Sequence, residues 1–186
     1  MQKIIILVVG LPGSGKTSVS NHIKEKFGAA VLKSGDVIRD EIKRRGWKYT
    51  TETDAEIAEW FHTREREKML VRRLWAKMKR SRKKIIVIDG FRVYENYTYL
   101  RKIAKREPFI IAVSSSTDVR VKRLLKRHRF GKDETRKYIK SRDKQEKRHG
   151  VMRLVKRANY KINNDKLSRR QTNARISKII KEIISK

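Results

Sequence analysis

The pattern of apolar and polar residues along the chain predicts alternating strands and helices. Continuous apolar, β-branched runs at residues 4–9, 85–88 and 109–113 are typical of strands buried on both faces of a parallel sheet. Shorter runs at residues 29–33 and 160–162 predict two further strands. Between the strands, apolar residues recur at intervals of three and four, which indicates helices. We therefore expect an α/β fold of three layers, with a mostly parallel five-stranded sheet and helices on both faces.

The helices follow the strands in turn. The spacing predicts helices ending at Gly28 and Gly46, a long helical stretch over residues 53–78, and helices over 94–106, from Thr117 or Asp118, over 133–147 and around 176–183. In the long stretch, Trp60 and Trp75 fall on an apolar stripe, so we interpret them as core residues rather than as a cofactor-binding pair. No internal repeat and no Gly-, Ser- or Pro-rich linker divides the chain. We expect residues 1–186 to form one domain.

The segment after the first strand matches a phosphate-binding loop (P-loop). Residues 10–17 read Gly-Leu-Pro-Gly-Ser-Gly-Lys-Thr, which fits G-x-x-x-x-G-K-[ST] between a predicted strand and a predicted helix. Glycines let backbone N–H groups turn toward phosphates, and the helix N-terminus adds a favourable dipole. A glycine-rich turn without function rarely fits all the fixed positions. We predict that a nucleotide triphosphate is bound by Gly10, Gly13, Ser14, Gly15, Lys16, Thr17 and Ser18.

Two carboxylates lie where predicted strands end. Asp89 closes the strand at residues 85–88, at the edge where open α/β sheets bind their ligands. Asp36 lies where the strand at residues 29–33 gives way to a helix. Each has a structural alternative, because an aspartate can cap a helix at that boundary or form a turn before Gly90.

Positive charge is the second strong feature. The chain has 51 Lys and Arg against 20 Asp and Glu, a net charge of +31. Residues 120–186 hold 25 basic and 6 acidic side chains, so the last third carries most of the excess. A solvated surface rich in charge usually gains both signs together. A field of one sign attracts polyanions, and it favours RNA as a partner.

Composition excludes several kinds of chemistry and a membrane-spanning segment. The sequence has no cysteine, which excludes disulfides, thiolate catalysis and cysteine zinc sites. The longest apolar run, residues 4–9, is far too short to cross a bilayer, and the N-terminal residues do not resemble a secretory signal. We expect a cytoplasmic protein with no membrane partner.

Several segments together resemble the nucleoside-monophosphate kinase branch of the P-loop proteins, which includes the adenylate kinases. The likeness covers nearly the whole chain and is strongest to dephospho-CoA kinases and their archaeal relatives. It rests on residues 10–17, Ser34-Gly35-Asp36-Val37-Ile38-Arg39, Val87-Ile88-Asp89-Gly90-Phe91-Arg92, Arg142-Asp143-Lys144-Gln145-Glu146 and Ala158-Asn159-Tyr160-Lys161-Ile162-Asn163. The resemblance implies an ATP-dependent P-loop kinase, with acceptor-binding helices at about residues 36–80 and a basic helical lid at about 126–150.

The resemblance also implies roles for single residues. Arg39 matches the arginine that contacts the acceptor phosphate in adenylate kinases, and Asp36 matches the aspartate that acts on the acceptor hydroxyl in dephospho-CoA kinases. Asp89 and Thr17 match the residues that hold Mg²⁺. Arg92 is expected on the acceptor side, although adenylate kinases place a proline before the corresponding arginine.

Lid arginines complete the predicted site. They would close over the phosphates, exclude water and neutralise developing charge. The candidates are Arg123, Arg127, Arg129 and Arg142. The residues that we predict to be catalytic are Lys16, Asp36, Arg92, Arg127 and Arg142.

The acceptor remains open between several classes. The first hypothesis is transfer of the γ-phosphoryl group of ATP to a hydroxyl of a nucleotide or coenzyme precursor. The second is the same chemistry on RNA, held by the basic last third, with Phe130, Tyr138 or Trp47 available for stacking. The third is an RNA-binding or assembly factor whose ATPase activity only resets a conformation.

Overall fold

The structure, a computed structural model, describes residues 3–61, 63, 66–126 and 132–186. The expected five-stranded sheet is present, and each neighbouring pair of strands runs parallel, in the order β2-β3-β1-β4-β5. The strands are β1 (Ile4–Val9), β2 (Ala30–Lys33), β3 (Ile85–Asp89), β4 (Phe109–Ser114) and β5 (Tyr160–Asn163).

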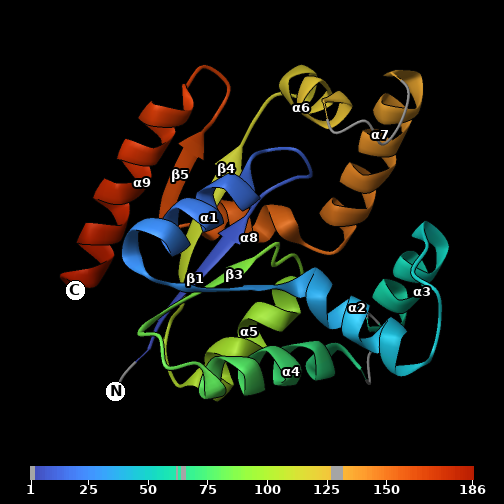
Figure 1. Ribbon diagram of the computed structural model, residues 1–186, viewed down its shortest axis with the longest axis horizontal. Coiled ribbons are helices and arrows are strands. Elements are labelled where there is room, and N and C mark those ends of the chain that lie inside the picture. Colours follow the sequence, from blue (N-terminus) through green and yellow to red (C-terminus); the bar gives the residue numbers. More distant parts are fainter. Residues whose placement is uncertain (1–2, 62, 64–65, 127–131) are drawn as a thin grey trace.

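Helices cover both faces of the sheet, as expected (Figure 1). Helices α1 and α9 pack on one face, whereas α2, α3, α4, α5 and α8 pack on the other. The bounds are α1 (Lys16–Phe27), α2 (Ser34–Arg44), α3 (Thr51–Phe61), α4 (Glu67–Arg80), α5 (Tyr94–Ala104), α6 (Thr117–Leu125), α7 (Lys132–Arg148), α8 (Val151–Arg157) and α9 (Arg169–Ile184). Within the described residues, no helix combines the length and the apolar character that a membrane span requires.

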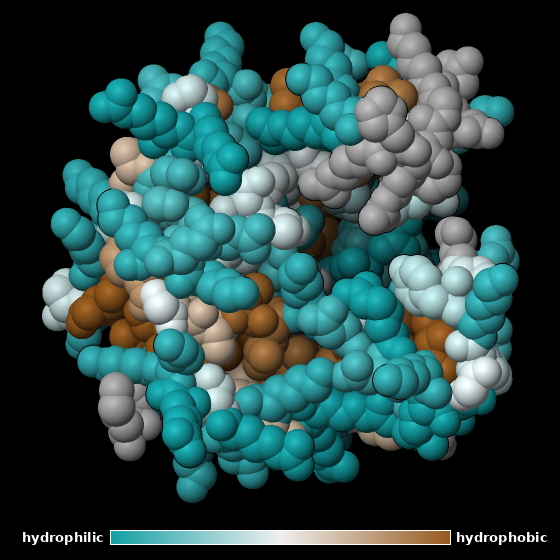
Figure 2. All heavy atoms as spheres, viewed as in Figure 1, coloured by the Kyte–Doolittle hydropathy of each residue, from teal (hydrophilic) through white to brown (hydrophobic). Residues whose placement is uncertain are grey.

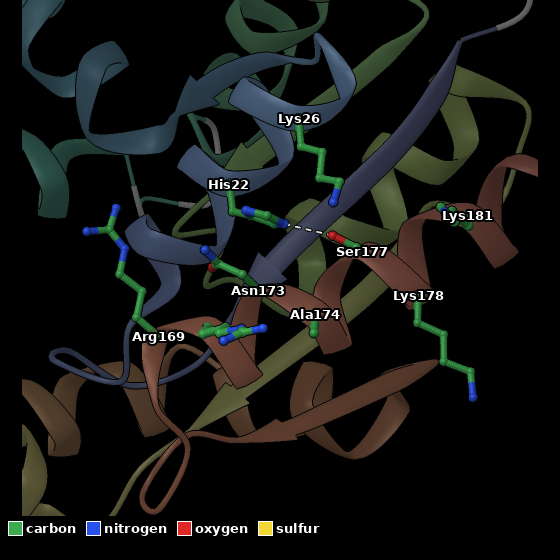
Figure 3. Close-up of a pocket in the computed structure, with 9 residues that line it drawn as sticks. His22, Lys26, Arg169, Asn173, Ala174, Ser177, Lys178 and Lys181 are labelled. Atoms are coloured by element: carbon green, nitrogen blue, oxygen red, sulfur yellow. Dashed lines mark hydrogen bonds between the residues drawn. The ribbon is translucent and has the colours of Figure 1, made fainter.

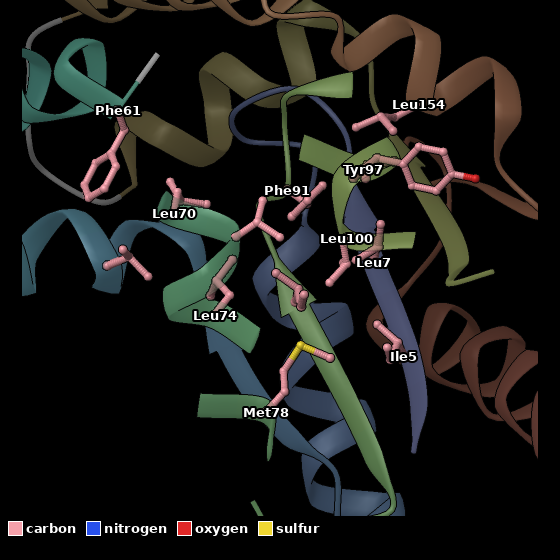
Figure 4. Close-up of a cluster of buried hydrophobic side chains, with 14 of the residues drawn as sticks. Ile5, Leu7, Phe61, Leu70, Leu74, Met78, Phe91, Tyr97, Leu100 and Leu154 are labelled. Atoms are coloured by element: carbon pink, nitrogen blue, oxygen red, sulfur yellow. The ribbon is translucent and has the colours of Figure 1, made fainter. Parts of the chain in front are cut away.

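Strand β1 shows why the apolar runs are continuous. Its side chains alternate between two cores: Ile5 and Leu7 face the cluster drawn in Figure 4, and Ile6 and Val8 face the cluster beneath α1 and α9. Both faces are dry, so no position in the strand can be polar.

The helices differ from the sequence prediction in two places. The stretch at residues 53–78 forms two helices, because no apolar residue after Phe61 continues the stripe until the second helix has begun. Trp60 and Trp75 pack partly buried against the core, as interpreted. Helix α8 was not predicted, because a seven-residue helix that buries only Val151 and Leu154 is too short to show a period.

The parallel register brings the motifs to one edge. Asp89, the last residue of β3, lies beside both Val8 of β1 and Lys33 of β2. The segments that follow these strands therefore emerge next to one another, at the edge where open parallel sheets bind ligands.

Candidate active site

The phosphate-binding loop is held in a conformation that only glycine permits at its ends. Gly10 has φ +142°, and a Cβ there would lie 2.1 Å from the carbonyl oxygen of Val113. Gly15 has φ +105°, and a Cβ there would lie 2.5 Å from Nδ2 of Asn164. These glycines let the loop pack directly against β4 and the segment after β5 while it leads into α1.

Side chains outside the loop hold the Ser14 carbonyl of the loop in place. The Ser14 carbonyl accepts hydrogen bonds from Arg123 Nη1 (3.1 Å), Asn164 Nδ2 (3.2 Å) and Ser115 Oγ (3.3 Å). Arg123 also donates to the Asn164 carbonyl at 2.6 Å. Arg123 is one of the predicted lid arginines, but in this structure its guanidinium forms hydrogen bonds to the loop and to Asn164.

Lys16 lies folded back over the loop. Its Nζ donates to the carbonyl oxygens of Gly10 (2.8 Å) and Leu11 (3.0 Å). Burial lowers the pKa of Lys16 to about 8, and the nearby Glu146 carboxylate partly opposes that shift. A buried ammonium on the loop is well placed for anions, because the same low dielectric that disfavours an isolated charge strengthens its attraction to a phosphate.

Thr17 and Asp89 form a pair at the start of α1. The Thr17 hydroxyl donates to Asp89 Oδ2 at 3.0 Å, and Asp89 is only 6% exposed. Burial raises the pKa of Asp89, whereas the Thr17 hydrogen bond and the charge of Lys16 lower it. In the described part of the chain, no three metal-ligating His, Cys, Asp or Glu side chains gather. One carboxylate and one hydroxyl still fit Mg²⁺ at a phosphate, because this ion keeps several waters and uses few protein ligands.

On the side predicted to bind the acceptor, Asp36 and Arg39 form an ion pair one turn apart on α2, each about half exposed. The helix begins at Ser34, after Lys33 as the N-cap residue, so Asp36 lies inside the first turn. Asp36 is therefore not the cap that a strand-to-helix boundary allowed. A carboxylate in the first turn still interacts favourably with the helix dipole.

Glu146 of α7 connects two predicted catalytic arginines. It is 2% exposed, and its Oε1 lies 3.2 Å from Arg92 Nε and 3.4 Å from Arg142 Nη2. Arg142 also donates to Gln145 at 2.7 Å. Both arginines are thus bound to a carboxylate in this structure.

A cleft of about 250 Å³ joins these segments (Figure 2 shows the recess between the α6–α7 region and the α2–α3 region). The predicted residues that line it are Gly13, Gly15, Lys16, Thr17, Arg39, Asp89 and Arg92. Those absent from the lining are Gly10, Ser14, Ser18, Asp36 and Arg142. Arg127 lies outside the described residues, as do Arg129 and Phe130. Tyr138, predicted only as a stacking residue, lines the cleft with Lys33 and Leu124.

Sequence reasoning overlooked the buried charges behind the loop. Arg120 of α6 is 2% exposed and binds both oxygens of Asp143 of α7, at 2.7 and 2.6 Å. Its Nη1 also donates to the Pro12 carbonyl at 3.2 Å. In so basic a segment, composition gives no sign of which charges are buried. The segment at residues 142–146 contains Asp143 and Glu146, but its resemblance to kinases predicts a role for Arg142 alone.

Sequence comparison relates the chain to known proteins. Residues 9–141 match the model of a family described as an AAA domain. A UPF0200 protein of Hyperthermus butylicus is 31% identical over 163 residues, which cover 88% of this chain and 86% of that protein. A UPF0200 protein of Pyrobaculum aerophilum is 33% identical over 179 residues, covering 96% and 98%.

Solved structures share the fold. TT1252 from Thermus thermophilus superposes with a TM-score of 0.67 at 17% identity, over 98% of each chain. A shikimate kinase from Acinetobacter baumannii gives a TM-score of 0.62 at 19% identity, over 98% of this chain and 94% of that one. The sheet, the loop and these neighbours define a P-loop protein with a kinase-like fold. The chain is a member of the UPF0200 family of archaeal proteins.

Proposed function

We propose that the protein is an ATP-dependent kinase that transfers the γ-phosphoryl group of ATP to a hydroxyl of a nucleotide-like acceptor. One observation supports this function above all: donor-side and acceptor-side groups line the same cleft. Lys16 and Thr17 of the loop share it with Arg39 of α2 and Arg92 after β3. A protein that only bound ATP would need no second set of cations facing the phosphates.

On the donor side, the loop binds the β- and γ-phosphates through its N–H groups and Lys16. Thr17 and Asp89 would hold Mg²⁺, which, when bound, neutralises charge on the phosphate oxygens. Asp89 is oriented for this role by the hydrogen bond from Thr17. Lys16 exchanges its two carbonyl partners for phosphate oxygens when ATP enters.

On the acceptor side, the oxygen of the acceptor hydroxyl bonds to the γ-phosphorus, and ADP leaves. Asp36 accepts the proton that this hydroxyl loses. Arg39 orients the Asp36 carboxylate, and Arg39 and Arg92 bind a phosphate already present on the acceptor. A phosphate acceptor is itself an anion and needs no base. The carboxylate beside Arg39 therefore favours a hydroxyl.

The contacts of Glu146 suggest how Arg92 and Arg142 are released. Both arginines are bound to this carboxylate, and Glu146 is also the acidic side chain with the strongest influence on Lys16. Phosphates entering the cleft compete with Glu146 for these cations. Arg92 then becomes available to the acceptor.

Replacing Asp36 with Asn tests the acceptor chemistry. With ATP labelled in its γ-phosphoryl group and dephospho-CoA, nucleosides, nucleoside monophosphates and total RNA as acceptors, the wild type should label one class. Asp36→Asn should lower the turnover roughly 100-fold, because the hydroxyl loses its proton acceptor. The KM for ATP should stay the same.

Asp40→Asn is the matched control, because Asp40 is an exposed carboxylate on the same helix that pairs with Lys77 at 2.6 Å. It should transfer label at the wild-type rate. Full activity of Asp36→Asn would show that the acceptor needs no base. Label found only in free phosphate would exclude a kinase.

The pKa of Lys16 predicts a pH dependence for the free protein. The ammonium loses its proton as the pH rises through about 8, and a neutral amine does not attract phosphates. The kcat/KM for ATP should therefore fall about tenfold per pH unit above this value, whereas kcat should fall only at higher pH, because bound phosphates stabilise the ammonium. Lys16→Arg, which stays charged, should remove the fall. A flat wild-type profile up to pH 9.5 would contradict the assignment.

A further inference from the structure

A groove of about 890 Å³ lies between α1 and α9, away from the cleft (Figure 3). His22 of α1 and Ser177 of α9 face each other across it, with His22 Nε2 2.9 Å from the Ser177 hydroxyl. The groove and the cleft share no lining residue. A ligand in this groove is therefore not a part of the phosphotransfer site.

The side chains that line the groove carry charge of one sign. Five of them are cationic: Lys26, Arg169, Arg170, Lys178 and Lys181. Among the described residues that line it, none is a carboxylate. Of the acids on these two helices, Glu25 does not line the groove, and Glu182 is bonded to Tyr160 and Lys186.

These five cations have no acidic partner at ion-pair distance within the residues that the structure describes. Some exposed cations elsewhere are paired, for example Lys77 with Asp40 and Arg153 with Glu95, whereas here five cations with no ion pair to a described residue line a single groove. The groove is thus a local excess of positive charge, with a stronger field than an evenly mixed surface would produce.

Two of the cations stand where a helix disfavours them. Arg169 and Arg170 open α9, whose first turn has no acidic residue. The helix start is otherwise well built, with a capping box between Ser168 and Gln171. Cations beside the positive end of a helix dipole reduce stability, so folding gives no reason for their position. Binding of an anion gives one.

We propose that the α1–α9 groove binds the phosphodiester backbone of a nucleic acid strand. Arg169 and Lys181 are twelve residues apart on one helix, about 18 Å, so the cations extend well beyond the reach of a single phosphate. A single nucleotide would leave most of these cations unused. No Phe, Tyr or Trp is among the described residues that line the groove, and the His22 ring is hydrogen-bonded to Ser177, so the contact is with the backbone and carries little sequence preference.

Fluorescence anisotropy with a labelled 20-nucleotide oligouridylate tests this proposal, using the full chain without ATP over a series of salt concentrations. The variant Arg169→Gln/Arg170→Gln/Lys178→Gln removes three phosphate contacts. The slope of log K against log salt should become shallower by about 2, and the affinity at 0.1 M salt should fall roughly 100-fold. A DNA strand of matching length should behave in the same way.

Lys79→Gln/Arg82→Gln/Lys102→Gln is the charge-matched control, with three exposed cations removed from the side of the sheet that α4 and α5 cover. It should keep the wild-type slope. An equal loss of affinity in this control would mean that the strand is held by diffuse electrostatic attraction to the whole surface. An unchanged salt slope in the groove variant would show that the strand does not bind in the groove. Displacement of the strand by polyglutamate of equal charge would assign the groove to acidic proteins instead.

Two further measurements separate this inference from folding defects and from the kinase proposal. The groove variant should unfold at the wild-type temperature or above it, since it removes two cations from a helix N-terminus. Lys16→Ala should bind the strand with wild-type affinity, because Lys16 lies in the other cavity. Loss of strand binding in Lys16→Ala would overturn the separation of the two sites.

Discussion

Replacing Lys16 with Met should lower phosphotransfer at least about 1000-fold and leave the fold intact. The side chain is the buried cation of the loop, and removing a preorganised charge from a water-excluded site costs on the order of a thousandfold in rate. Met keeps most of the aliphatic stem. Turnover with γ-labelled ATP, measured beside an equilibrium unfolding curve, checks both parts.

The same substitution should not reduce stability. The pKa of Lys16 is about 8 in the folded protein and near 10.5 in the unfolded chain, so the unfolded chain binds more protons between these values. The free energy of unfolding of the wild type should therefore rise as the pH increases from about 8 to 10.5. Lys16→Met should lack that rise and be at least as stable as wild type at pH 7.

Lys33 provides the control, because its exposed side chain lines the same cleft. Lys33→Met should change the rate far less than Lys16→Met. Wild-type transfer by a folded Lys16→Met protein would refute the proposed role of the loop lysine.

Replacing Asp143 with Ala should lower the free energy of unfolding by about 3–5 kcal/mol. Arg120 makes a two-pronged ion pair with Asp143 and is almost fully buried, so the substitution leaves an uncompensated charge in the interior. The pair joins α6 to α7 and lies against the loop at Pro12. Urea denaturation at pH 7 measures the loss.

Arg136→Gln is the matched control, because it removes a second ion pair between the same two helices. Arg136 and Asp118 are 3.3 Å apart and both mostly exposed. This change should cost no more than about 0.5 kcal/mol. Similar losses in the two variants would mean that burial of Arg120 does not determine the strength of the link.

Much of the fold was predictable because its signals are local. A strand that is dry on both faces must be apolar at every position, and β1 shows this in residues 4–9. A loop that wraps phosphates needs glycine at strained positions, and Gly10 and Gly15 occupy them. The position of Asp89 was predictable because a strand end in a parallel sheet is also an edge of the sheet.

Long-range contacts account for what was missed. In the sequence, nothing separates Arg123, Arg142 and Glu146 from the many other charged residues on predicted helices. The fold gives them different environments, with Arg123 supporting the Ser14 carbonyl, and Arg142 joining Arg92 at Glu146. The i,i+4 spacing along α7 accounts for the Arg142–Glu146 pair, but the contacts of Arg92 with Glu146 and of Arg123 with Ser14 join distant parts of the chain, and no spacing along one helix encodes them.

The sequence by itself determined the parallel sheet, the phosphate-binding loop and the excess of positive charge, because each follows from residue types that neighbour one another in the chain. Only the tertiary structure decided where the charges lie relative to the loop. It placed Arg39 and Arg92 beside the loop, buried Arg120 behind it, and brought five cations together between α1 and α9. The reason is physical: the effect of a charge depends on its distance from other charges and from water, and folding sets both.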